Sequence, residues 1–187
     1  MLFLSEMKGV IFSEYLDFVE NGFGYDAVDD IIASCDLASE GAYTSIGSYP
    51  FEELQQLLTQ TCIIVDRSAE ELLKGFGAHL FTMFVSSYGH FFEHSKSSFD
   101  ILSVLDDHIH PEVLKLYPDA ELPSFEVTER SDSHMVMVYK STRKMSTLAE
   151  GLIESCMVHF KEEGIVKAEQ LDEFGEIVRF TISRTAH

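Results

Sequence analysis

The chain has little positive charge. Only 13 lysines and arginines face 32 aspartates and glutamates, which gives a formal net charge of −19 over 187 residues. A surface this negative repels nucleic acid and anionic lipid, so we expect no phosphate-backbone partner. Cysteine is also scarce, with three widely spaced residues: Cys35, Cys62 and Cys156. That pattern predicts reduced thiols in a cytosol, and the lack of any Cys-x-x-Cys-His motif excludes covalent cofactor attachment through it.

The sequence also lacks a long apolar run. Residues 1–4 are apolar but far too short for a membrane span or the core of a signal peptide. Hydrophobic residues make up 45% and charged residues 24%, close to the globular average, which excludes disorder. We therefore expect one cytoplasmic domain over residues 1–187, with residues 1–6 as a possible N-terminal extension because Met7 resembles a second start.

Tryptophan is absent, whereas phenylalanine, with 15 residues, and methionine, with seven, are common. Such a soft aromatic interior fits either a plain core or the enclosure of a flat apolar cofactor. Apolar residues recur at helical spacing through the first two-thirds of the chain. This spacing predicts helices near 10–22, 25–35, 50–62, 68–84 and 99–113. Ser68 and Glu71 form a capping box at one helix start, and Pro50 suits the first turn of another.

After Pro118 the pattern changes to alternation and β-branched residues. We predict strands at 125–128, 135–141, 165–169 and 177–183, with one helix over about 148–160 between the second and third. Helices first and strands later predict an α+β fold: a helical N-terminal part, then an antiparallel four-stranded sheet with a long helix. We divide the domain into parts at roughly 7–66 and 67–187.

One motif, His90-x-x-Glu93-His94, matches the inverted zinc-peptidase pattern. Two histidines four residues apart share a helical face, and the glutamate would act as general base. Glu150 or Glu154 would supply a third ligand. The alternative function is thus a zinc-dependent hydrolase, and the structural alternative is a pair of surface histidines beside core phenylalanines.

A second motif is Asp107-His108-Ile109-His110-Pro111. Either histidine could be a core residue or an iron ligand, because a neutral imidazole ligates well when its second nitrogen is held by a hydrogen bond. Inside a helix Pro111 would cost about 3 kcal/mol or more. We therefore expect it to start or kink a helix next to His110.

A third motif places Tyr139, Ser141 and Arg143 at alternate positions. In a strand these three side chains would share one face and form a clamp of two hydroxyls and a guanidinium, suited to carboxylates or phosphate. The alternative is an edge strand with a solvated basic end.

Taken in order, these motifs resemble the haem–nitric oxide/oxygen binding (H-NOX) family, the haem sensor domain also found in soluble guanylate cyclase. The resemblance covers nearly the whole chain from Met7. It rests on Met7-Lys8-Gly9, on His110 seven residues before Tyr117-Pro118, on Pro123-Ser124-Phe125, on the Tyr-x-Ser-x-Arg pattern at 139–143 and on the helical segment 151–154. Each piece alone is weak, but their order is specific.

The resemblance implies a bacterial sensor with a non-covalent haem b enclosed between a distal part (7–66) and a proximal part (67–187). His110 would be the proximal iron ligand, and His108 a neighbour without a role. Tyr139, Ser141 and Arg143 would hold the haem propionates. Other cofactor contacts fall on Ile11, Pro118, Leu148 and Leu152.

Oxygen-binding members resemble one another in a distal tyrosine nine residues after the position of Tyr139, where this chain has Leu148. Leucine donates no hydrogen bond, and the charge on bound oxygen is costly without a donor. We therefore expect a sensor that binds NO and CO but not O2, unless Tyr15 or His79 supplies a donor.

The family also implies an output without catalysis. NO would weaken or break the bond from iron to His110 and shift the two halves of the domain. Since the chain ends at His187 without an effector domain, we expect a partner in trans: a histidine kinase, or a cyclic-di-GMP cyclase or phosphodiesterase. No site for a cysteine-held zinc is expected, because only Cys156 lies in the C-terminal part.

Overall fold

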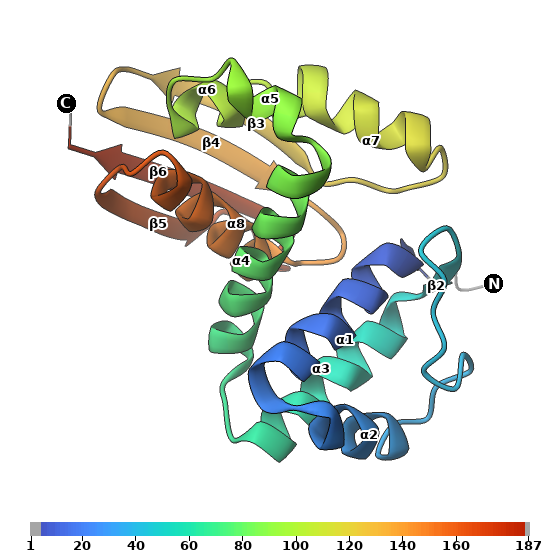
Figure 1. The fold of residues 1–187 in the computed structure, drawn as a ribbon. Coiled ribbons are helices and arrows are strands. Elements are labelled where there is room, and N and C mark those ends of the chain that lie inside the picture. Colours follow the sequence, from blue (N-terminus) through green and yellow to red (C-terminus); the bar gives the residue numbers. More distant parts are fainter. Residues whose placement is uncertain (1–4, 186–187) are drawn as a thin grey trace. The chain divides into compact units, whose positions relative to one another are not determined.

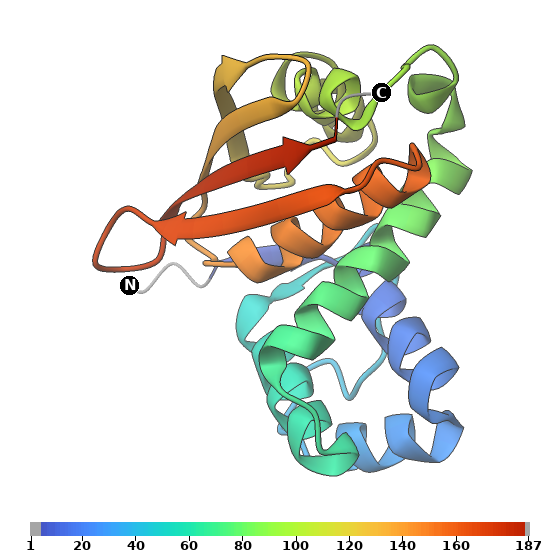
Figure 2. The same ribbon diagram turned by 90° about the vertical axis from the view of Figure 1, so that its left-hand side faces the viewer.

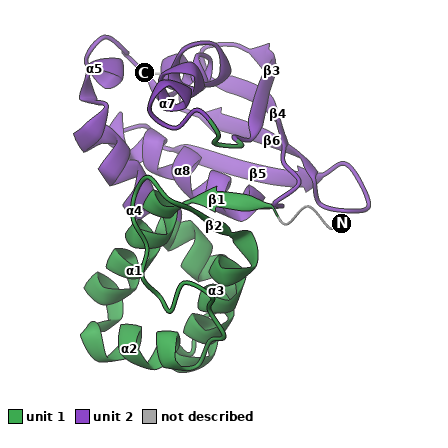
Figure 3. Ribbon diagram, turned by 90° about the vertical axis from the view of Figure 1, so that its right-hand side faces the viewer, with its two compact units in different colours: residues 1–76, 119–121 green, residues 77–118, 122–187 purple. Residues whose placement is uncertain are grey.

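The computed structural model of the protein describes residues 5–185. Residues 1–4, within the possible N-terminal extension, and residues 186–187 lie outside the described part. The chain divides into two units, Met1–Phe76 with Asp119–Glu121 (unit 1) and Gly77–Pro118 with Leu122–His187 (unit 2), as Figure 3 shows. Among residues 5–185, no helix is both long and apolar enough to cross a membrane.

Unit 1 is mainly helical (Figure 1). Its elements are β1 (Glu6–Lys8), α1 (Gly9–Phe23), α2 (Tyr25–Ala33), β2 (Ser48–Pro50), α3 (Phe51–Val65) and the start of α4 (Ala69–Ser87). The capping box forms as predicted, because the Ser68 amide donates to the Glu71 carboxylate at 3.0 Å and the Glu71 amide donates to Ser68 Oγ at 3.2 Å. Pro50 precedes the first turn of α3 and does not occupy it.

A short sheet that the sequence did not predict joins the start of unit 1 to the segment before α3. Glu6 pairs with Pro50, and the Phe51 amide donates to the Ser5 carbonyl at 2.8 Å. Residues 5 and 6 thus take part in the fold. At Gly9 an added Cβ would lie 2.0 Å from the Thr44 carbonyl oxygen, so the first residue of α1 has no room for a side chain.

The core of unit 1 is aromatic. Phe12, Tyr15 and Phe76 are at most 1% exposed, and the rings of Tyr15 and Phe76 meet edge to face with centroids 5.1 Å apart. Each such ring contributes about 1.5–3 kcal/mol through burial. The Tyr15 hydroxyl reaches a partner inside this core, donating to Thr61 Oγ1 at 2.9 Å.

Unit 2 holds the sheet. After the rest of α4 come α5 (Gly89–Glu93), α6 (Ser98–Leu102), the π-helix η1 (Leu105–Ile109), α7 (His110–Leu116), β3 (Ser124–Arg130), β4 (His134–Lys140), α8 (Ser146–His159), β5 (Gly164–Gln170) and β6 (Ile177–Arg184). The four strands are antiparallel in the order β3-β4-β6-β5. The predicted α+β class, with an antiparallel four-stranded sheet and a helix between its second and third strands, is confirmed.

One face of this sheet carries the core of unit 2. Figures 1 and 2 show α8 lying along the sheet, and α6 packs into the same cluster. Alternate residues of β4 and β6 point into it, as the period of a half-buried strand requires. The buried members are Phe99, Leu102, Met135, Met137, Tyr139, Ala149, Ile153, Met157, Val178, Phe180 and Ile182.

The continuous helix predicted over 99–113 is wrong. The segment is broken into α6, η1 and α7. In η1 the amide of Ile109 donates to the Val104 carbonyl at 3.1 Å, the wider hydrogen-bond spacing of a π-helix. The spacing of apolar residues alone does not distinguish a π-helical turn from an α-helical one, because the π-helical turn shifts the hydrogen-bond register by only one residue.

Candidate functional site

His110 stands at the junction of η1 and α7. Pro111 occupies the first turn of α7, where its missing N–H leaves no intrahelical bond unmade, so the helix starts beside His110 as predicted. The His110 Nδ1 atom lies 2.9 Å from Asp106 Oδ1, one turn earlier. His108 is exposed on the same turn.

The electrostatics of His110 favour a neutral ring. Burial lowers the pKa of His110 and outweighs Asp106, whose carboxylate acts in the opposite direction. The side chain is 17% exposed. A neutral imidazole that donates from Nδ1 to Asp106 carries its lone pair on Nε2, which is the form that ligates metals.

The second group of predicted residues lies at the end of β4. Tyr139 is in the strand and points into the core with Met135 and Met137, as its parity predicts. The extension of that strand face to Ser141 and Arg143 is wrong, because β4 ends at Lys140 and a turn follows.

The turn nevertheless gathers the three side chains. The Arg143 amide donates to Ser141 Oγ at 3.2 Å, and the Met145 amide donates to the Tyr139 hydroxyl at 3.1 Å. Burial raises the pKa of Tyr139, while Ser141, Met145 and Arg143 act to lower it. Arg143 is 9% exposed. Two hydroxyls and a largely buried guanidinium form a donor set suited to carboxylates.

The remaining predicted contacts lie on other elements. Leu148 and Leu152 are half-buried on α8, where the backbone approaches α4: a Cβ on Gly77 would lie 2.7 Å from the Leu148 carbonyl oxygen. Pro118 is exposed just after α7. Ile11 lies on α1 in unit 1 and is half-buried.

The zinc alternative is not supported. Of its motif, His90 and Glu93 lie in the short α5, His94 follows the end of that helix, and all three are exposed. Across residues 5–185, no group of three or more histidine, cysteine, aspartate or glutamate side chains could hold a metal ion. Neither Glu150 nor Glu154 therefore completes a site with the two histidines.

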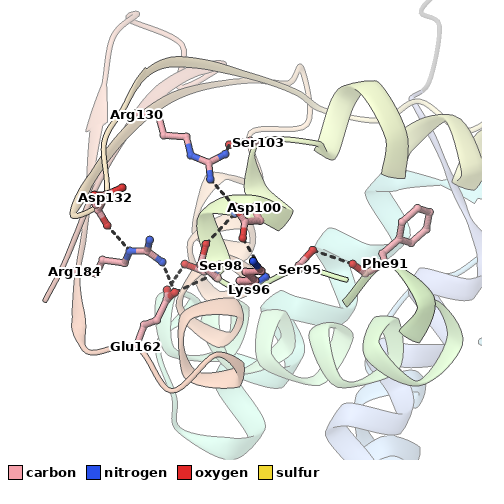
Figure 4. Close-up of polar contacts among 11 residues, drawn as sticks. Phe91, Ser95, Lys96, Ser98, Asp100, Ser103, Arg130, Asp132, Glu162 and Arg184 are labelled. Atoms are coloured by element: carbon pink, nitrogen blue, oxygen red, sulfur yellow. Dashed lines mark hydrogen bonds and ion pairs between the residues drawn. The ribbon is translucent and has the colours of Figure 1, made fainter. Parts of the chain in front are cut away.

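A further polar cluster at the start of α6 is structural (Figure 4). The Glu162 carboxylate, 6% exposed, binds Arg184 and Ser98, and the Arg184 guanidinium lies 4.0 Å over the Phe99 ring. Next to it Asp100 pairs with Arg130 at 2.5 Å. Each charged side chain of this cluster is paired with an opposite charge of the protein, so we assign the cluster a structural role.

Asp106 was not predicted from the sequence as a site residue. Its carboxylate binds His110 at one oxygen and, at the other, the amide of Phe125 at 2.8 Å. The spacing of four residues before His110 is the feature of the sequence that could have indicated the pairing.

His110, with one nitrogen held by Asp106, and the turn of donors after β4 both lie in unit 2. The model of the haem-NO-binding family matches residues 8–168, and the chain belongs to this family as a bacterial H-NOX domain. Members are gas-sensor domains and not enzymes, and the family binds haem.

Solved structures agree with this assignment. The Fe(II) unliganded H-NOX protein from K. algicida is 40% identical, with 97% of this chain and 98% of that chain covered and a TM-score of 0.91. The H-NOX from Shewanella woodyi, solved in the Fe(II)CO state, is 37% identical, with coverages of 96% and 95% and a TM-score of 0.81. An Fe(II)NO H-NOX protein from S. oneidensis, 23% identical over 96% of this chain and 99% of that one, shares the fold with a TM-score of 0.84. No curated protein has a matching sequence.

Proposed function

We propose that this chain is a haem-based nitric oxide sensor that holds ferrous haem b non-covalently. In this proposal His110 is the proximal ligand, and Tyr139, Ser141 and Arg143 bind the propionates. The haem iron, when bound, supplies the position where NO or CO ligates. The S. woodyi relative in its Fe(II)CO state supports CO binding by the fold at 37% identity.

The observation that carries the proposal is the state of His110. The ring is mostly buried, burial lowers its pKa, and its Nδ1 lies 2.9 Å from Asp106 Oδ1, which leaves Nε2 free of that contact and able to ligate. The donor turn fits the acidic edge of a haem, because each charge-assisted hydrogen bond to a propionate would contribute about 1.5–3 kcal/mol. Leu148 and Leu152 on α8, together with Ile11 and Pro118, would supply apolar contacts.

Selectivity for NO over O2 is the finer part of the proposal. Leu148 has no hydrogen-bond donor, and O2 on ferrous iron needs one to persist, whereas NO does not. Tyr15, one of the two alternative donors, already donates its hydroxyl proton to Thr61. His79, the other, lies half-buried on α4 in unit 2.

The output would follow from His110. Its bond to iron would be the contact that differs between the free and NO-bound states, as any two-state switch requires. Weakening or loss of that bond on NO binding would release His110, the first residue of α7, from the cofactor. A histidine kinase or a cyclic-di-GMP cyclase or phosphodiesterase would detect the change in trans. The free cysteines fit a cytoplasmic location.

The test is an absorption spectrum of the purified, haem-reconstituted ferrous protein. We expect a Soret band that shifts on addition of NO and of CO and does not change to an oxygenated spectrum in air. A protein that takes up no haem would refute the proposal as a whole. A long-lived oxygenated spectrum would refute only its NO selectivity and would direct attention to Tyr15 and His79.

A further inference from the structure

The carboxylate of Asp106 has two partners on two different elements. Oδ1 lies 2.9 Å from Nδ1 of His110, and Oδ2 accepts the main-chain N–H of Phe125 at 2.8 Å. Asp106 lies in η1, His110 begins α7, and Phe125 is the second residue of β3. A single carboxylate therefore connects the imidazole to the sheet.

Ring packing reinforces this connection. The centroid of Phe125 lies 6.0 Å from that of His110 and 5.4 Å from that of Tyr139, which faces Phe125 across the β3–β4 ladder. The imidazole is thus anchored to β3, which pairs with the strand leading into the donor turn, and not to its own helix alone. His110 begins α7, and the Asp106 carboxylate in η1 connects its ring to β3.

We propose that Asp106 is the positioning residue of this site: it fixes the Nδ1–H tautomer of His110, aims Nε2, and ties the ring to β3 through the Phe125 amide. The proposal rests on the proposed function only in taking Nε2 as the haem ligand. A carboxylate on the far nitrogen also makes an imidazole a stronger ligand, and loss of such a partner typically reduces metal affinity or activity about 10–100-fold.

Two substitutions at Asp106 remove its hydrogen bonds to different extents. In Asp106→Asn the amide oxygen can accept from only one of the two N–H groups, that of His110 Nδ1 or that of the Phe125 main chain. The NH2 group would then face the remaining N–H, donor against donor. In Asp106→Leu both hydrogen bonds are lost at similar volume. Asp107→Asn, an exposed neighbour in the same turn, removes the same charge and is the matched control.

The first measurement uses the haem-free protein. Nitrogen-15 NMR of the imidazoles at mildly alkaline pH should show His110 with its proton on Nδ1 in the unmodified protein and in Asp107→Asn. Asp106→Leu should shift the population toward the Nε2–H tautomer and lose protection of the Phe125 amide from hydrogen exchange. An unchanged tautomer in Asp106→Leu would overturn the proposal, and a general loss of folding does not produce this selective change.

The second measurement uses the haem-loaded ferrous protein. We expect a lower iron–histidine stretching frequency and about tenfold faster haem loss in Asp106→Leu than in Asp107→Asn. Equal frequencies and equal rates in those two variants would refute the role of Asp106 while leaving the haem sensor intact. Failure of the unmodified protein to bind haem would refute the proposed function, and the tautomer measurement would still decide whether Asp106 positions His110.

Discussion

The two units treat buried polar groups differently. In unit 1 the Tyr15 hydroxyl donates to Thr61, whose own hydroxyl donates to the Leu57 carbonyl at 2.7 Å. Glu53, 3% exposed, accepts from Ser39 and from the Tyr43 hydroxyl. These chains of donors and acceptors close within the unit, as expected of polar groups that stabilise a core.

Unit 2 closes its Glu162 cluster in the same way but differs at His110 and at the turn after β4. Asp106 takes one nitrogen of His110, and the other carries a lone pair that the hydrogen bond at Nδ1 does not use. The turn after β4 concentrates donors for acids at Tyr139, Ser141 and Arg143. The comparison teaches that burial alone does not mark a ligating group, because the buried hydroxyls of unit 1 bind one another and a nearby carbonyl whereas His110 keeps a second nitrogen.

The largest effect on this difference between the units should come from removing the imidazole of His110, and with it Nε2. His110→Gly should lose its haem or retain it only with added imidazole, a fall of more than about 100-fold in affinity, since loss of an outer partner alone reduces affinity by about 10–100-fold. Haem titration of the haem-free variant measures it. His108→Ala, on the exposed side of the same turn, is the control and should bind like the unmodified protein. The reverse behaviour of the two variants would show that His108 is the ligand.

The donor turn gives the next largest effect. Arg143→Ala removes a largely buried guanidinium, and we expect haem retention to weaken by about 2–3 kcal/mol, because a propionate would remain without its charged partner. That corresponds to a roughly 30- to 140-fold faster haem transfer to an apo-globin acceptor. Arg179→Ala removes an exposed arginine paired with Glu169 at 2.9 Å and serves as the control. Equal transfer rates in the two variants contradict the propionate role of Arg143.

Much of the fold follows from local patterns. The capping box at Ser68 and Glu71 and the alternation in β4 and β6 act over a few residues, so the sequence displays them directly. The β1–β2 pair was not predicted because three-residue strands give no periodicity. The break at η1 was missed because the apolar spacing of Leu105, Ile109 and Val113 also fits a continuous α-helix.

For the proposed site, the sequence indicates residue types more directly than local geometry. Pro111 predicts a helix start beside His110, because proline is disfavoured in the interior of a helix. Asp106 resembles any acidic residue of a solvated face until the turn of η1 brings its second oxygen to Phe125, far along the sequence. The strand parity that groups Tyr139 with Arg143 fails because β4 ends at Lys140, although the turn that follows still brings the Arg143 charge close enough to act on the pKa of Tyr139.

A smaller effect tests whether the buried hydroxyl of Tyr15 serves only the core of unit 1. Tyr15→Phe should lower the free energy of unfolding by about 1 kcal/mol, the net value of one buried hydrogen bond, because Thr61 keeps its bond to the Leu57 carbonyl. Urea unfolding measures it, and Tyr25→Phe, at a residue 63% exposed, is the control. The spectra of the ferrous protein with NO and in air should not change. A change in either spectrum would mean that Tyr15 acts on the bound gas.

The smallest effect sharpens the contrast by adding a hydrogen-bond donor at Leu148, whose own side chain has none. Leu148→Tyr places a phenol on α8, one turn before Leu152. A hydrogen bond of about 1 kcal/mol would raise oxygen affinity only about fivefold, so we expect a transient oxygenated spectrum on rapid mixing with air, not a stable one. Leu148→Phe supplies the ring without the hydroxyl and should show no such species. If both variants form it equally, ring size and not hydrogen bonding controls oxygen at this position, and the exclusion of oxygen cannot be attributed to the missing donor at Leu148.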